Sequence, residues 1–209
     1  MEPMETVEAA YGDALEGSGV TFREAEARLL EGGGEAASFL RERAGTAEGA
    51  LASLVTHALL ARVEEGGALS RALADLEEMR RKALRTAAGG PSPAFVSGFL
   101  ETGYGPGLAP LMAAYLYKLW TVWPGWMTAG VALYVGEQGG PEVSDALLPM
   151  ALATRDPFQR EVAARALALT GDPALAARLE AVVAEAPDDL RPEVLASADD
   201  IRRRIEAFA

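Results

Sequence analysis

The hydrophobic positions of this chain recur at helical spacing along most of its length. Helices are predicted over residues 21–31, 35–44 and 67–88, among others. The clearest stripe has a 3.6-residue period and comprises Leu51, Leu54, Val55, Ala58, Leu59 and Val63. No run of alternating β-branched residues interrupts the pattern, so no strand is predicted. The pattern predicts an all-α fold.

Short polar, glycine and proline stretches predict where these helices begin and end. Thr21-Phe-Arg-Glu24 matches a capping box, and Thr46 is predicted to cap the helix that follows it. Gly89-Gly-Pro-Ser-Pro93 is the clearest break, because proline lacks an amide donor and glycine ends helices. Glu101 to Gly107 forms a second irregular piece. The chain therefore divides into an N-terminal helical half, a Gly/Pro-rich connection with a short helix and a C-terminal helical half: residues 1–88, 89–107 and 108–209.

The C-terminal half contains two similar segments. Ala129–Tyr134 aligns with Ala163–Ala168, and Gly140-Pro141 then falls on Asp172-Pro173. The period of roughly thirty residues is typical of a helix–turn–helix unit. Asp156-Pro157 and Asp172-Pro173 match the favoured start of a helix, with aspartate at the N-cap and proline first. Because one helix pair cannot bury its apolar face alone, we expect the pairs to stack, with a last helix over about 191–208 capping the stack.

These residues carry a resemblance to a known family. The run from Arg160 to Pro173, REVAARALALTGDP, resembles the second helix and following turn of a HEAT-like repeat, and the likeness is clearest over 141–185. It departs from the usual pattern at Ala163 and Thr170. The resemblance implies a right-handed α-solenoid-like stack of antiparallel helix pairs, without a sheet. HEAT-like proteins are mostly scaffolds, adaptors and binding platforms, and a minority, such as DNA glycosylases with basic grooves and bilin lyases, are enzymes or enzyme-associated. Function inferred in this way rests on analogy of architecture.

Charge and composition limit the kinds of partner that the protein is expected to bind. The net charge is -12, from 31 acidic and 19 basic residues, so phosphate backbones and anionic lipid surfaces are repelled on average. We therefore expect a protein partner and no nucleic acid. The chain has no cysteine, which excludes a disulfide framework and a thiolate metal site. The first residues lack the basic and apolar regions of a signal peptide, so we expect a cytoplasmic protein.

One segment, Leu108 to Val135, is rich in aromatic residues and carries a single charge, Lys118. Such a segment is either core or a surface that binds something apolar. A membrane hairpin is disfavoured, because Pro124-Gly125 divides the run into pieces shorter than the ~20 residues that span a bilayer. The candidate partner-binding residues are Tyr104, Tyr117, Trp120, Trp123 and Trp126.

Residues suited to catalysis are few. His57 is the only histidine, with Ser53 and Glu64 on the same predicted helix, and three residues on one short face of one helix rarely converge as a triad. Gly103 to Gly107 lacks the third glycine of a dinucleotide-binding loop. We expect no catalytic, cofactor or metal site.

Three functional hypotheses follow. The leading one is a non-enzymatic protein-binding adaptor or scaffold built on HEAT-like repeats. The first alternative is an enzyme or enzyme accessory that binds a small hydrophobic ligand or cofactor in an aromatic groove. The second is an acidic inhibitor or immunity-type protein that masks a basic partner surface.

Overall fold

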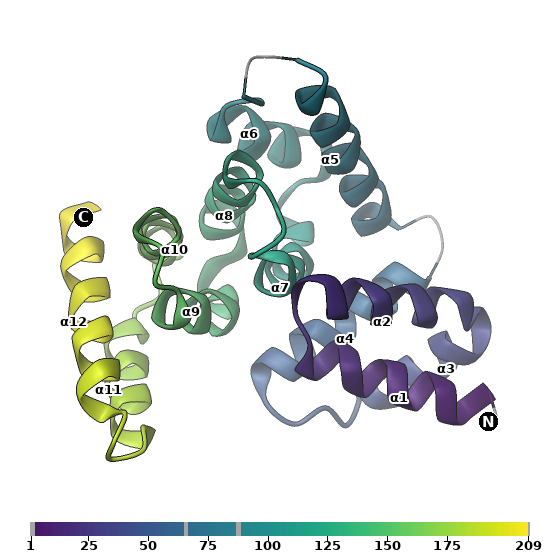
Figure 1. Cartoon of the computed structure of the whole chain (residues 1–209), viewed down its shortest axis with the longest axis horizontal. Coiled ribbons are helices and arrows are strands. Elements are labelled where there is room, and N and C mark those ends of the chain that lie inside the picture. Colours follow the sequence, from purple (N-terminus) through teal and green to yellow (C-terminus); the bar gives the residue numbers. More distant parts are fainter. Residues whose placement is uncertain (1–2, 65–66, 87–88, 209) are drawn as a thin grey trace.

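The structure is a computed structural model, and it describes residues 3–64, 67–86 and 89–208 (Figure 1). Over these residues the chain forms helices and turns with no strand, which confirms the predicted all-α class. The helices are α1 (Pro3–Glu16), α2 (Gly19–Glu31), α3 (Gly33–Ala44), α4 (Ala50–Val63), α5 (Ala68–Leu84), α6 (Pro93–Tyr104), η1 (Pro106–Leu108), α7 (Ala109–Leu119), α8 (Gly125–Gly139), η2 (Gly140–Val143), α9 (Ser144–Ala153), α10 (Pro157–Leu169), α11 (Leu175–Glu185) and α12 (Arg191–Phe208).

The first four helices form a group at one end of the molecule. Helix α1 packs on α2, α3 packs on α4, and both α2 and α4 contact α7 (Figure 1). The ring of Phe22 meets that of Tyr115 edge-on, with centroids 5.5 Å apart, and both rings are fully buried. The aromatic segment therefore supplies the surface on which the N-terminal helices pack.

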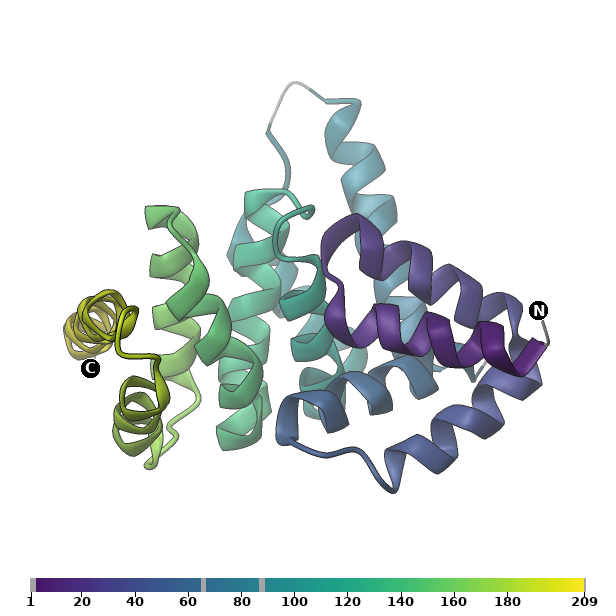
Figure 2. The ribbon, with the colours of Figure 1, turned by 60° about the horizontal axis from the view of Figure 1, so that its bottom comes forward.

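Four later helices lie side by side in one row. Helix α6 packs on α8, α8 on α10, and α10 on α12, which lies at the end opposite α1 (Figures 1 and 2). The four helices run parallel, because contacts move toward the C-terminal ends of both helices in each neighbouring pair. In α6 and α8, Val96 meets Gly130 and Glu101 meets Gln138; in α10 and α12, Arg160 meets Asp200 and Arg165 meets Phe208. Gly125 faces Phe158 and Gly136 faces Ala166 between α8 and α10. Helices α7, α9 and α11 alternate with the row, and each packs on the row helix that follows it in the chain.

Glycines in α8 allow this close packing. A Cβ atom at Gly136 would lie 2.5 Å from the carbonyl oxygen of Ala166 in α10, and one at Gly130 would lie 2.4 Å from the Cβ of Val96 in α6. Real Cβ atoms do not approach other atoms so closely. The two glycines therefore set the spacing of α8 from both of its neighbours.

Several helix ends differ from the predicted ones. Helix α2 begins at Gly19 after Ser18, so Thr21 lies inside the helix and the predicted capping box is wrong. The Thr46 hydroxyl donates to the carbonyls of Glu42 and Arg43, and therefore ends α3 and does not cap α4. Helix α4 begins only at Ala50, after Gly49 turns the chain at a φ of 89°. Glycine conformations, which sequence patterns do not specify, decided these boundaries.

Two further helix ends also differ from the predicted ones. Helix α5 ends at Leu84, and Ala88, where the helix was predicted to end, lies outside the described residues. Helix α6 continues to Tyr104, so the first part of the predicted irregular piece is helical.

The two aspartate–proline starts behave differently. The Asp156 side chain accepts a hydrogen bond from the Gln159 amide at 2.9 Å, and α10 begins at Pro157 as predicted. Asp172 also accepts from a backbone amide, that of Ala174 at 2.8 Å, but α11 begins at Leu175. The aspartate therefore closes a turn before the helix, and its predicted N-cap position is wrong.

Candidate functional site

The five aromatic candidates have different surroundings. Trp120 and Trp123 are 6% and 7% exposed, whereas Tyr104, Tyr117 and Trp126 are half-buried. Their role in partner binding stays a prediction, because that role depends on which surface of the molecule each ring reaches.

Two of the candidates make contacts that explain their positions structurally. The Tyr104 hydroxyl donates to the carboxylate of Asp75 in α5, and burial, followed by this carboxylate, raises the pKa of Tyr104 to about 12. The Trp126 ring covers Gly90, where a Cβ atom would lie 2.4 Å from the indole Nε1. Gly90 has a φ of 99°, which favours glycine, so only a glycine at this position lets the loop lie beneath the Trp126 ring.

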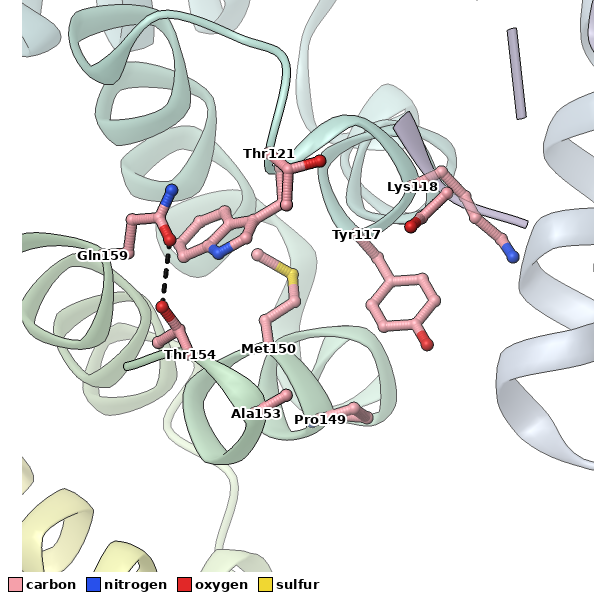
Figure 3. Close-up of a pocket in the computed structure, with 10 residues that line it drawn as sticks. Tyr117, Lys118, Thr121, Pro149, Met150, Ala153, Thr154 and Gln159 are labelled. Atoms are coloured by element: carbon pink, nitrogen blue, oxygen red, sulfur yellow. Dashed lines mark hydrogen bonds between the residues drawn. The ribbon is translucent and has the colours of Figure 1, made fainter. Parts of the chain in front are cut away.

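Tyr117 and Trp120 line the same hollow, of about 280 Å3. In Figure 3 its walls come from Tyr117 and Thr121 on one side and from Pro149, Met150 and Ala153 of α9 on the other. The Thr154 hydroxyl donates to the Oε1 of Gln159 at 2.9 Å, which leaves the amide nitrogen of Gln159 pointing away from Thr154 (Figure 3). The Nε1 of Trp120 is buried without a hydrogen-bond partner among the described residues.

Lys118 lies in the wall of this hollow, but its amine points away from it (Figure 3). The amine donates to the carbonyls of Leu15 at 2.5 Å and Gly17 at 2.9 Å, at the C-terminal end of α1. A cation there complements the helix dipole. Burial lowers the pKa of Lys118 to about 8. The only charge of the aromatic segment therefore links α7 to the end of α1, and the wall of the hollow that Lys118 forms carries no charged group facing the hollow.

Two further hollows adjoin the first one at Pro149. One, of about 420 Å3, shares Tyr117, Lys118 and Pro149 and extends to Leu51 at the start of α4. The other, of about 370 Å3, shares Pro149 and Ala153 and extends to Val182 and Val194 of the last two helices. We call the three hollows together the Pro149 groove. Because Pro149 lies inside α9 and has no amide hydrogen, it cannot donate to the carbonyl of Asp145 one turn earlier.

Trp123 lines a separate cavity, of about 320 Å3, between α2, α4, α5, α7 and α8. The Tyr115 hydroxyl donates to the Oε1 of Glu26 at 2.5 Å, and the Nε of Arg62 donates to the same oxygen at 3.0 Å. Burial, followed by the Glu26 carboxylate, raises the pKa of Tyr115 well above its usual range. Sequence reasoning missed this cluster, because its members come from three helices far apart in the chain.

The histidine candidates do not assemble. The Nδ1 of the exposed His57 lies 2.7 Å from the backbone oxygen of Ser53, and its distance from the Ser53 hydroxyl is 3.4 Å. Glu64 instead forms an ion pair with Arg41, with nitrogen and oxygen 2.8 Å apart. The three residues therefore lack the base–carboxylate contact of a triad.

Metal-binding groups and membrane-spanning helices are both absent from the described part of the chain. Within it, no group of three or more histidine, cysteine and acidic side chains is placed to hold a metal ion. None of the described helices is long and apolar enough to cross a bilayer.

The chain was compared with protein-family models, with curated proteins and with solved structures, and none of the three comparisons found a match.

Proposed function

We propose that this protein is a non-enzymatic adaptor or scaffold that binds an extended segment of another protein in the Pro149 groove. The observation that supports this function is the series of three adjoining hollows across α9, two of which share Tyr117 and two of which share Ala153. A single ligand pocket would be closed at its ends, whereas a series of hollows suits a chain that places successive side chains in successive sites.

We further propose that the C-terminal half is a right-handed α-solenoid of HEAT-like repeats. Three features support it: the parallel row of α6, α8, α10 and α12, the alternating helices, and the burial of two pairs of apolar residues that match when Gly140-Pro141 is aligned with Asp172-Pro173. Those residues are Val143, Leu147, Leu175 and Leu179.

An arginine also links one proposed repeat to the next. The Nη1 of Arg178 in α11 donates to Asp145 of α9 at 2.6 Å, and its Nε lies 3.0 Å from Asp172 in the preceding turn. The second contact is electrostatic, because neither atom meets hydrogen-bond geometry within the described residues. Such a bridge fixes the angle between stacked units.

The walls of the groove define the segment that it would accept. Tyr117, Pro149 and Met150 offer aromatic and apolar surface, while Gln159 and Thr121 offer uncharged polar groups. Since the amine of Lys118 points elsewhere, the first hollow favours apolar side chains over charged ones. The other two hollows also carry charged residues, which are Glu48 and Asp145 in one and Arg155, Arg160 and Glu193 in the other. The chain carries a net charge of -12, so basic residues flanking the apolar segment would be attracted.

Selection from a library of random peptides displayed on phage would test this function. The expected result is enrichment of peptides with apolar side chains between lysine or arginine residues. Ala153→Arg places a long charged side chain in the two hollows that share Ala153, and Ala153 is exposed, so the fold should be kept. We expect this variant to weaken the selected peptides at least about tenfold.

The matched control is Ala9→Arg, which makes the same change at an exposed position of α1 that lines none of these hollows. It should bind the peptides like the wild type. Failure to enrich any peptide, or equal binding by the Ala153 and Ala9 variants, would overturn the proposed role of the groove.

A further inference from the structure

The cavity lined by Trp123 has an unusual balance of charge. Glu26 is compensated by the Nε–H of Arg62 and by the hydroxyl of Tyr115. Glu77, which also lines the cavity, forms an ion pair with Arg80, with nitrogen and oxygen 3.3 Å apart. Arg23 lines the same cavity and forms no hydrogen bond or ion pair within the described residues. The uncompensated charge of the lining is therefore positive.

The remaining walls are apolar and come from different helices. They are formed by Leu73 of α5, Leu119 of α7, Met127 of α8 and Trp123 in the turn between α7 and α8. An indole ring and a thioether are polarisable surfaces that suit a flat or flexible apolar group. The cavity volume of about 320 Å3 lies at the small end of the range for ligand sites. Apolar walls with one unpaired guanidinium form an amphipathic site.

A partly buried cluster of Glu26, Arg62 and Tyr115 lies in the wall of the cavity. Glu26 and Arg62 are partly buried, with side chains 13% and 29% exposed, and partial burial of a charge is unfavourable unless it is paired. Here a shared oxygen joins the carboxylate to Arg62 and Tyr115. Since the pKa of Tyr115 is raised, its hydroxyl stays protonated at neutral pH and adds no negative charge to the lining. The cluster therefore holds polar side chains rigidly beside Trp123 without cancelling the charge of Arg23.

We propose that this cavity binds a small amphipathic anion, an organic carboxylate or sulfonate, whose apolar part lies against Trp123 and Met127 and whose anionic group contacts Arg23. A guanidinium presents several N–H groups in a plane and matches the oxygens of such an anion. The site is formed by α2, α4, α5, α7 and α8, and shares no lining residue with the hollows of the Pro149 groove. It does not depend on the proposed adaptor function.

Two fluorescent probes that differ by one sulfonate group test the proposal on the full-length protein. The first is 8-anilinonaphthalene-1-sulfonate, an amphipathic anion, and the second is N-phenyl-1-naphthylamine, the same skeleton without the sulfonate. Each is titrated into wild-type protein and into Arg23→Gln, and dissociation constants are taken from probe fluorescence. Because Arg23 has no protein partner in the described structure, its replacement should leave the fold intact, which far-ultraviolet circular dichroism checks.

The expected result is one binding site for the anion that Arg23→Gln weakens about tenfold, with unchanged affinity for the neutral probe. Arg85→Gln is the matched control, because Arg85 is exposed, has no partner among the described residues and does not line the cavity. It should leave both affinities unchanged.

A second variant locates the site independently of charge. Leu73→Trp fills the cavity from α5 at a half-buried position and should abolish binding of both probes. The proposal is overturned if the wild type does not bind the anion, if Arg23→Gln and Arg85→Gln bind it equally well, or if Leu73→Trp still binds it.

Discussion

Replacing Gly136 by alanine should separate two helices of the parallel row. Gly136 lies in α8 and faces α10, where an added Cβ atom would meet the carbonyl oxygen of Ala166 at 2.5 Å, its Cα at 2.9 Å and its carbonyl carbon at 3.1 Å. These are backbone atoms, so no side-chain rotation relieves the contact. The helices must move apart, which loosens the packing of the buried Val135 and Leu167 nearby.

The magnitude follows from two opposing effects. In an open helix, alanine is more stable than glycine by about 0.8–1 kcal/mol. Overpacking a close-packed interior costs about 1–3 kcal/mol, and a clash with backbone lies at the upper end of that range. We therefore expect Gly136→Ala to lower the free energy of unfolding by about 1–2 kcal/mol, after the gain in helix propensity is subtracted.

Gly98→Ala is the matched control, because Gly98 lies in α6 and an added Cβ atom there meets nothing within 4 Å. This variant should be more stable than the wild type by up to about 1 kcal/mol. The measurement is urea unfolding followed by far-ultraviolet circular dichroism, with thermal melting as a second reading. A loss of 1–2 kcal/mol corresponds to a melting temperature lower by about 2–8 °C in a chain of this size. If Gly136→Ala were as stable as Gly98→Ala, α8 and α10 would not approach as closely as described.

Four other predictions follow from the same structure. Trp120→Ala should lower stability by about 3–5 kcal/mol in urea unfolding, because the ring is buried; a loss below about 1 kcal/mol would contradict its place in the core. Asp156→Ala should cost about 1 kcal/mol by the same assay, since it removes the N-cap bond to Gln159, and an unchanged midpoint would argue against that cap. Burial lowers the pKa of Lys118 from 10.5 to about 8, so the unfolded chain binds more protons than the folded one between these pH values. The free energy of unfolding should therefore rise with pH from about 8 toward 10.5. Lys118→Met should remove this rise from the pH profile, and identical slopes for the variant and the wild type would refute it. Truncation after Asp189 removes α12, which buries Ala198 and Ile201, and should cause aggregation or loss of cooperative melting; an unchanged melting curve would show that α12 does not cap the stack.

The sequence by itself determined those features that depend on a few neighbouring residues. The all-α class follows from apolar periodicity, and the break at Gly89–Pro93 follows from the backbone limits of glycine and proline. The start of α10 was predicted correctly because Asp156 bonds to an amide only three residues away. Prediction failed at Thr21 and Thr46, where the positions of neighbouring glycines decided where the next helix began.

Only the tertiary structure decided what the aromatic segment does. Its periodicity allowed both core and binding surface, because a ring on an apolar helix satisfies either. Packing of α2 and α4 on α7 buried Tyr115, turned the amine of Lys118 toward the end of α1, and left Tyr117 half-buried in the groove. Tyr115 meets Glu26 across 89 positions of sequence, and Arg62 meets Glu26 across 36. Contacts between residues so far apart in the chain form only when the chain folds back on itself. They therefore produce no local sequence pattern from which they could be predicted.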